Sequence, residues 1–426
     1  MSYDEAIKFL YSLRWFGARF GLANTLKLAA LAGNPQDGLR FIHVAGTNGK
    51  GSTCSMLESI YRAAGLRVGL FTSPHLVGFC ERIQVNRQLI PETEVARLVE
   101  QIRAWLVAFP PEDHPTFFEV VTVMALLYLR SQKCDLVIWE TGLGGRLDAT
   151  NIVRPLASVI TNIQYDHQKY LGETLADIAS EKAGIIKPGT ALITGTEAPD
   201  ALEVIRNKAN ELRAPLTLVT PADAHAPPLD HLTLPLLGEH QKMNAAVAVA
   251  VVRTLQDVLP CPEEAIRSGL LHVSWPGRLQ LATLASGQRV LLDGAHNLSG
   301  VESLVAALKT YFLGTKPAVI LGILQDKDWV HMCQALAPLA SAMFLVPVHS
   351  ERTAEPHGLA EACRLANPQA MVAECGSLAD ALAKAEPFPF LTVAGSLYLI
   401  GEALELLHLS PIKAAQERGL NEWSVR

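Results

Sequence analysis

The sequence predicts an α/β protein of two domains, each built around its own mostly parallel sheet. The chain has 426 residues, enough for two or three domains. Short β-branched runs alternate with longer helical patterns, which is typical of parallel strands joined by helices that cover the sheet. The alternation forms two series that meet just after Trp275-Pro-Gly. We therefore expect one domain at residues 1–279 and a smaller, Rossmann-like α/β domain at residues 280–426.

The expected elements follow in order along the chain. In the first series a Gly-rich turn and a helix from Ser52 to Ala64 follow the first strand, and the strands are expected at residues 40–45, 67–71, 135–139, 157–161 and 191–194. In the second series strands are expected at residues 289–293, 318–322, 342–346 and 390–394. Four prolines and two histidines lie between Pro221 and Pro235, which predicts a surface loop there.

Composition excludes several classes of protein. The net charge of -6 gives no general reason to bind nucleic acid, so an anionic substrate must be held by local basic groups. The seven cysteines form no CxxC pair and their number is odd, which indicates a reducing compartment and no zinc site. The N-terminus lacks a signal-peptide pattern, and the longest apolar run, Val120 to Leu129, is too short to span a bilayer. A cytoplasmic protein is expected.

The Gly-rich turn Gly46-Thr-Asn-Gly-Lys-Gly-Ser-Thr53 is the strongest local signal. Glycines let consecutive N–H groups point at phosphate oxygens, and the following helix adds partial positive charge. Lys50 can neutralise phosphate charge, and Ser52 offers a hydroxyl to a metal ion or phosphate. The match is imperfect because Gly51 stands where a P-loop has a hydroxyl residue. The alternative is an ordinary Gly-rich turn, but strand, loop, lysine and helix in this order favour a P-loop-type first domain.

Acidic and imidazole side chains follow two further strands. Glu140 comes directly after one, and Asp166-His167 comes after the next. Ligands bind beyond the carboxyl ends of parallel strands, where a carboxylate can hold Mg²⁺. Taken singly, each of these residues is as well explained by a capping or loop role. Lys182 similarly looks like an ordinary cation at a helix end.

Taken together, the motifs resemble the folylpolyglutamate synthase family of the Mur ligase superfamily. The resemblance runs from the first helix to about Glu402, and the departure at Gly51 is normal in that family. The segments that carry it are Gly46–Ser52, Glu140–Asn151, Asp166-His167, Leu171–Leu175, Glu181–Lys187, Gly238–Asn244, Trp275–Arg278, Asp293–Asn297 and Ala394–Tyr398.

The resemblance implies a reaction and a set of roles. A folate or pteroate carboxylate takes the γ-phosphoryl group of ATP, and the amino group of glutamate then attacks the acyl phosphate. The resemblance implies ATP contacts for Gly49, Lys50, Gly51, Ser52, Asn244, Arg278 and Asp293. It implies Mg²⁺ ligands at Ser73, Glu140 and His167, and N-carboxylation of Lys182, which would then bridge toward the second metal ion. His296 and Ser396 are candidates for positioning glutamate.

The same resemblance implies where the pterin binds. The family segments that touch it match Gly21–Thr25, Thr116-Phe117-Phe118-Glu119 ahead of a long helix, and Leu147-Asp148-Ala149. Two aromatic rings can stack on a flat heterocycle, although a core role for both phenylalanines is the alternative. Chain length and these segments resemble the bacterial members that act on both dihydropteroate and reduced folates. An enzyme that only extends folates is the second reading.

Other classes fit less well. Peptidoglycan-precursor ligases carry an additional N-terminal domain, and too little chain precedes Gly46 to form one. A nucleotide switch or a simple ATPase would not need the full set of Ser73, Glu140, His167 and Lys182. A monomer that binds only small molecules is expected.

Overall fold

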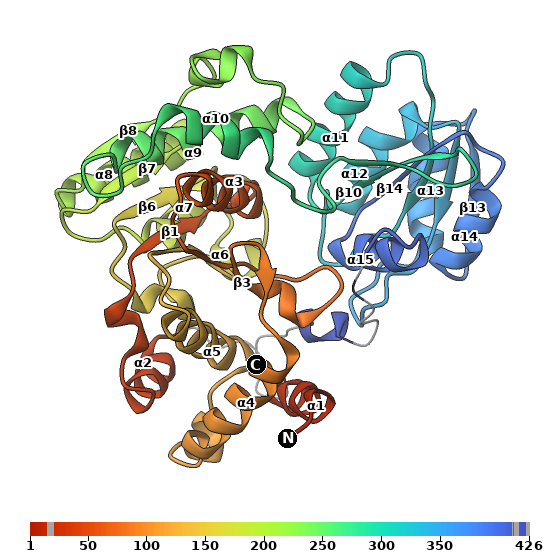
Figure 1. Ribbon diagram of the computed structural model, residues 1–426. Helices are drawn as coiled ribbons and strands as arrows, with labels where there is room; N and C mark the ends of the chain where they lie inside the picture. The colour runs from red at the N-terminus through yellow and green to blue at the C-terminus, as the bar shows by residue number, and fades with distance from the viewer. Residues whose placement is uncertain (15–20, 411, 413–416, 423–426) are drawn as a thin grey trace.

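The computed structural model describes residues 1–14, 21–410, 412 and 417–422, and it has two α/β domains side by side (Figure 1). The first sheet has the strand order β4-β3-β2-β5-β1-β6-β7-β8. It is parallel except where β3 pairs with β2 and β4. Its strands are β1 Phe41–Ala45, β2 Val68–Phe71, β3 Ile83–Val85, β4 Gln88–Leu89, β5 Leu136–Glu140, β6 Ala157–Ile160, β7 Ala191–Thr194 and β8 Leu216–Leu218.

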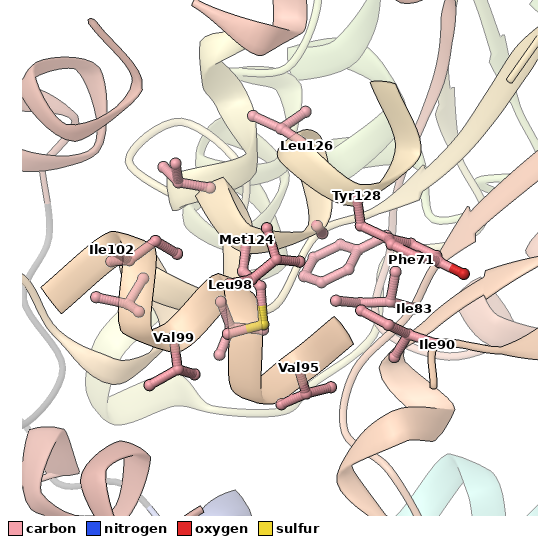
Figure 2. Packing of buried hydrophobic residues seen from close by; sticks show 14 of the residues in the cluster. Phe71, Ile83, Ile90, Val95, Leu98, Val99, Ile102, Met124, Leu126 and Tyr128 are labelled. Carbon is pink, nitrogen blue, oxygen red and sulfur yellow. The ribbon is translucent and has the colours of Figure 1, made fainter. Parts of the chain in front are cut away.

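Helices cover both faces of this sheet. They are α1 Tyr3–Leu13, α2 Ala23–Leu31, α3 Lys50–Ala63, α4 Glu92–Leu106, α5 Phe117–Ser131, α6 Gln168–Leu171, α7 Leu175–Ala183, α8 Pro199–Glu211, α9 Glu239–Thr254 and α10 Glu263–Leu271. On one face, apolar side chains of α4 and α5 point toward those of β2 and β3 (Figure 2). The opposite face packs against α3, α9 and α10. The long apolar run at Val120–Leu129 is accounted for by α5, which is buried in the first of these layers.

The second sheet has the order β13-β12-β11-β14-β10-β9 and is parallel except for β9. Its strands are β9 Gln280–Thr283, β10 Arg289–Asp293, β11 Ala318–Leu321, β12 Ala342–Leu345, β13 Met371–Glu374 and β14 Phe390–Ala394. Its helices are α11 Leu298–Tyr311, α12 Trp329–Leu336, α13 Pro356–Ala366, α14 Leu378–Ala385 and α15 Leu397–Leu406. The predicted α/β class with two mostly parallel sheets is confirmed.

The chain returns to the first domain near its end. Residues 417–422, called the C-terminal segment below, contain the short 3-10 helix η9 (Arg418–Asn421). Leu420 is buried in the core of the first domain, and the Glu417 carboxylate accepts hydrogen bonds from the Tyr3 hydroxyl and the Phe79 amide. The C-terminal segment therefore packs against the first domain, although it follows the second domain in the sequence.

One local expectation was wrong. Residues 221–235 are not a simple surface loop, because Ala224, Leu229 and Leu234 are buried in the core beside α9. Two short 3-10 helices, Asp223–His225 and Leu229–His231, bring these side chains inward. The helix expected after the Gly-rich turn, from about Ser52, is present and runs from Lys50 to Ala63. Within the described ranges, no helix has both the length and the apolar character to cross a membrane.

Candidate functional site

Four neighbouring strands end at the same edge of the first sheet. The strands β2, β5, β1 and β6 lie side by side and run parallel, so the segments that follow them are brought together. Ser73 follows β2, Glu140 is the last residue of β5, the Gly-rich turn follows β1, and Asp166-His167 comes after β6. The parallel topology therefore brings these candidate site residues together beyond the carboxyl ends of the strands, as predicted.

The loop after β6 holds the Gly-rich turn in place. The amides of Thr47 and Asn48 donate to the backbone and side-chain oxygens of Asn162, at 3.0 and 2.9 Å. Gly49 then caps α3 with a φ of 81°, a left-handed conformation that favours glycine. The amides of the first turn of α3 have no partner inside the helix and face an anion-binding position.

Gly51, which departs from the general P-loop pattern, has a packing reason. A Cβ atom at this position would lie 2.9 Å from the indole Nε1 of Trp275. Trp275 belongs to the segment that leads into the second domain, so a larger residue after the lysine would displace the indole ring. Ser52, the next residue, supplies the hydroxyl that position 51 lacks. It lines the cavity around the Gly-rich turn.

Two lysines converge on one carbonyl of the turn. Lys50 Nζ donates to Gly46 O at 3.1 Å, and Lys182 Nζ donates to the same oxygen at 2.9 Å. Burial and the charge of Lys50 lower the pKa of Lys182 to about 7. Lys182 does lie in the last turn of α7, as expected of a cation at a helix end, but α7 turns its side chain into the protein, where it is 4% exposed.

Glu140 and Ser73 offer oxygen ligands beside the turn. One carboxylate oxygen of Glu140 accepts from the Ser73 amide at 3.1 Å, and both residues line the cavity that contains the turn. Burial raises the pKa of Glu140 to about 7, although the charge of Lys50 opposes the shift. A carboxylate with hydroxyls at Ser52 and Ser73 is a donor set that suits Mg²⁺ carrying water and phosphate as its other ligands. Within the described residues, no cluster of three His, Cys, Asp or Glu side chains forms an all-protein metal site.

The neighbouring Asp166 joins the two domains. Its carboxylate accepts from Lys327 Nζ at 2.5 Å and from Asn297 Nδ2 at 3.0 Å, both in the second domain. Asn297 also exchanges amide hydrogen bonds with Asn48 of the Gly-rich turn. Burial lowers the pKa of His167 to about 3, so its imidazole is neutral and fit to ligate a metal ion.

Two cavities meet at this edge. The larger, about 830 Å³, is lined by every residue for which the resemblance implies contact with nucleotide or metal. The smaller, about 250 Å³, is lined by the candidate substrate residues, namely Thr116, Phe117, Phe118, Glu119, Leu147, Asp148, Ala149 and Ser396. Ser73, His167 and His296 line both. The two cavities therefore connect beside these residues, so a ligand in one can contact a ligand in the other.

Three candidate nucleotide residues lie around the larger cavity. Asn244, on α9, points at the Gly-rich turn, since a Cβ atom at Gly49 would lie 2.3 Å from its Oδ1. Arg278 lies between the domains, where burial lowers the pKa of its guanidinium and the charge of Asp293 opposes the shift. The Asp293 carboxylate accepts from the amides of Leu279 and Ala295, at 2.7 and 3.0 Å, and so shapes the segment next to Arg278.

The aromatic segment of the smaller cavity differs from expectation. Phe117 does not precede the long helix but is its first residue, with Thr116 as the N-cap. The Glu119 carboxylate accepts from both the amide and the hydroxyl of Thr116, forming a capping box. Thr25 is not at the cavity surface but donates to Glu119 from behind, whereas Gly21 lines the cavity. The helix start therefore holds Phe118 at the cavity wall.

The Asp148 carboxylate is fully used within its own loop. One oxygen accepts from the amides of Gly142 and Leu143, at 3.0 and 2.8 Å, and the other accepts from the amide and hydroxyl of Thr150. These bonds fix the chain between β5 and the 3-10 helix Ala149–Ile152. Leu147, just before this helix, and Ala149, its first residue, both line the smaller cavity. Asp148 is thus placed to shape the pocket wall.

The second domain brings two candidates to the same place. Ser396 caps α15 by accepting from the Tyr398 amide at 3.2 Å and is almost completely buried. The imidazole Nδ1 of His296 lies 2.8 Å from Gly294 O, and its Nε2 lies 3.6 Å from Asp166. The carboxyl ends of β10 and β14 therefore face the smaller cavity.

Several residues at the cavities were missed in the sequence. Lys327 follows β11, so the rule that sites form beyond strand ends could have found it. Tyr398 ends the motif Ala394–Tyr398 but was given no role, and the others lie far apart in sequence and belong to no motif: Arg14, Arg82, Arg352 and residues 420–422.

Comparisons with known proteins agree with this arrangement. The model of the Mur ligase middle domain matches residues 44–252, and that of the Mur ligase, glutamate ligase domain matches residues 277–397. The dihydrofolate synthase/folylpolyglutamate synthase of Bacillus subtilis is 36% identical over 94% of this chain and 98% of its own length. The folylpolyglutamate synthase of Lacticaseibacillus casei is 34% identical over 96% and 99%. The structure of Escherichia coli FolC in complex with DHPP and ADP superimposes with a TM-score of 0.83 at 31% identity, covering 96% of this chain and 98% of that one.

Proposed function

Because this chain belongs to the dihydrofolate synthase/folylpolyglutamate synthase family of Mur ligases, an ATP-dependent family that joins an acid to an amino acid, we propose that it adds L-glutamate both to dihydropteroate and to reduced folates. The observation that carries the proposal is the meeting of the two cavities at Ser73, His167 and His296. A phosphoryl donor in the larger cavity and a carboxylate acceptor in the smaller one would face each other there.

ATP would occupy the larger cavity. The amides of residues 49–52 and the Lys50 ammonium would hold its phosphates, while Asn244 would face the adenine and Arg278 the phosphates. The oxygen donors of Ser73 and Glu140, with the neutral His167 nearby, would hold Mg²⁺. Bound Mg²⁺ would neutralise charge on the phosphate oxygens and so make the γ-phosphorus a better electrophile.

The acceptor would occupy the smaller cavity, with its flat ring beside Phe118 and the loop at residues 147–149. Its carboxylate oxygen attacks the γ-phosphorus, the bond to the bridging oxygen breaks, and ADP leaves. The free amine of glutamate then attacks the acyl carbon, and inorganic phosphate leaves as the amide forms. His296 and Ser396 would orient glutamate, and enclosure between the domains would keep water from the acyl phosphate.

We also assign Lys182 as the residue that becomes carboxylated. With a pKa near 7, a large share of its amine is neutral at physiological pH and can add CO₂. The resulting carbamate would replace a cation that the adjacent Lys50 repels. It would also supply an anionic oxygen toward a second metal ion.

The two domains would have different roles. Residues 1–279 would bind ATP, metal and pterin, and residues 280–426 would contribute to glutamate and nucleotide binding. A monomer that binds only small molecules is part of the proposal. All seven cysteines are free, which supports a cytoplasmic location.

The test is phosphate release from Mg·ATP with purified protein, run with and without L-glutamate and with either dihydropteroate or tetrahydrofolate. Glutamate-dependent release with both acceptors is expected. Release with tetrahydrofolate alone would favour the alternative, a synthase that only extends folates, in line with the folylpolyglutamate synthase of L. casei. Release that needs neither acceptor nor glutamate would refute the ligase.

A further inference from the structure

Arg82 is a buried cation in the wall of the smaller cavity. It ends the 3-10 helix Phe79–Arg82, is 3% exposed, and lies with its guanidinium carbon 5.4 Å from the centroid of the Phe117 ring. Burial lowers the pKa of Arg82 to about 10, so the group remains charged at neutral pH. A charge in this position is costly unless something compensates it.

The hydrogen-bond partners of Arg82 are neutral. Its Nε donates to His75 Nδ1 at 2.9 Å, and its Nη2 donates to Asn421 Oδ1 at 2.5 Å. Because His75 Nδ1 accepts, its proton is on Nε2, which donates to Glu417 O at 2.9 Å. Among the residues that the structure describes, no carboxylate forms an ion pair with Arg82 and no protein acceptor meets its Nη1.

Two other cations of the same cavity, Lys327 and Arg352, are paired with acids. Lys327 lies 2.5 Å from Asp166, and Arg352 forms ion pairs with Glu422 and Asp326. Arg82 therefore differs from them in having a charge that no acid in the described part of the chain balances, although it faces the cavity.

The C-terminal segment fixes this geometry. Asn421 accepts from Arg82 and donates its own Nδ2 to His75 O at 2.9 Å, while the Glu417 backbone orients the His75 ring. An aspartate has the size of Asn421 and would neutralise Arg82, although it could not donate to His75 O. A neutral amide instead holds the guanidinium and leaves its charge available.

We propose that Arg82 binds a carboxylate of a substrate in the smaller cavity, and that Asn421 is a positioning residue for it. The inference rests on the proposed ligase function. Three sources of a carboxylate have the required chemistry. They are the incoming glutamate, the α-carboxylate at the end of an acceptor's glutamate chain, and the acceptor carboxylate that becomes phosphorylated. Arginine suits each, since its planar fork matches a carboxylate.

The test compares KM values of wild type, Arg82→Lys, Arg82→Met and Asn421→Asp, with Arg40→Met as control. Arg40 is an exposed arginine that donates to Asp135 O outside both cavities. Loss of a charge-assisted hydrogen bond should raise the KM of the bound substrate about 10-fold to 100-fold, with a smaller rise for Arg82→Lys and none for Arg40→Met.

The pattern of KM changes identifies the carboxylate. A rise for glutamate with both acceptors assigns the incoming amino acid. A rise for tetrahydrofolate alone assigns the α-carboxylate of the acceptor, because dihydropteroate has none. A rise for both acceptors but not for glutamate assigns the reacting carboxylate. Unchanged KM values in all Arg82 variants, or a rise confined to ATP, would overturn the inference, whereas an inactive wild type would instead refute the ligase.

Asn421→Asp separates substrate binding from a structural role. The new carboxylate would pair with Arg82 inside the protein but lose the hydrogen bond to His75 O, so thermal stability should stay close to that of wild type while the same KM rises about 10-fold or more. This variant also serves if Arg82→Met does not fold. A stable Asn421→Asp protein with wild-type KM values would show that the charge of Arg82 is structural, and would overturn the proposal.

Discussion

Replacing Lys182 by methionine is expected to stabilise the folded protein while abolishing ligation. The native fold buries this amine beside Lys50 and lowers its pKa from an ordinary 10.5 to about 7. At a pH between these two pKa values, the Lys182 amine is protonated in the unfolded chain and neutral in the folded chain. The wild type therefore gains stability as pH rises through this window, and a side chain that cannot be protonated lacks that dependence.

The size of the effect follows from the two pKa values. Ionisation of Lys182 opposes folding by about 4 kcal/mol at pH 7, by about 2 kcal/mol at pH 9, and by less than about 0.5 kcal/mol at pH 10.5. Methionine loses the hydrogen bond to Gly46 O, about 1 kcal/mol, although Lys50 still satisfies that oxygen. The variant should thus be more stable by about 3 kcal/mol at pH 7 and by about 1 kcal/mol at pH 9.

The measurement is urea unfolding followed by tryptophan fluorescence at pH 7, 8 and 9, in buffer freed of CO₂ so that no carbamate forms. Lys208→Met, which removes a lysine from a surface pair with Glu211, is the control and should change stability by less than about 0.5 kcal/mol at every pH. The reasoning fails if Lys182→Met is less stable than wild type at pH 7, or if its advantage does not shrink as pH rises.

Three further predictions concern the turn, the metal site and the domain contact. Because burial raises the pKa of Glu140 to about 7, calorimetry should find Mg·ADP bound about tenfold more weakly at pH 6 than at pH 8. Gly49→Ala should raise KM for ATP at least about tenfold in steady-state assays, since the new Cβ atom would lie 2.3 Å from Asn244 Oδ1. Lys327→Met leaves the Asp166 carboxylate buried without its ion pair, and should lower the unfolding free energy by about 3–5 kcal/mol in denaturant titrations.

Each of these has a matched control. Glu140→Gln should abolish the pH dependence of Mg·ADP binding, and a dependence that persists would assign it to another group. Gly65→Ala, at a φ of 90° with open space around it, shares the backbone strain of Gly49→Ala but should leave KM for ATP unchanged. Lys384→Met breaks an exposed pair with Asp380 and should cost less than about 1 kcal/mol; an equal loss at both lysines would contradict the role of burial.

The elements predicted from sequence are those with a continuous apolar pattern. The central strands β1, β5 and β6 are buried on both faces, and their apolar runs could be recognised within one residue of the observed bounds. Short edge strands such as β8 and β13 were missed, since their residues are partly exposed and their runs are only three or four residues long. Edge strands depend on pairing with a neighbour more than on their own composition.

The site residues also divide into those that could be predicted from sequence and those that could not. Residues that follow strand ends, such as Glu140 and His167, could be placed together because parallel topology determines where strand ends meet. The burial of Lys182 could not be anticipated, since it depends on the direction in which α7 faces the Gly-rich turn. Arg82 and Asn421 escaped because they are 339 positions apart and meet only in the folded chain.

That separation has a consequence for how the protein is made. The smaller cavity is walled by residues from near the start of the chain and by Leu420, Asn421 and Glu422. During synthesis the first domain can fold as a unit before the second has emerged. Its buried Arg82 then has no Asn421 to hold it, and Leu420 has yet to enter the core. The smaller cavity is therefore completed only after residue 422 has left the ribosome, and until then the folded first domain exposes the apolar surface that Leu420 covers in the finished protein.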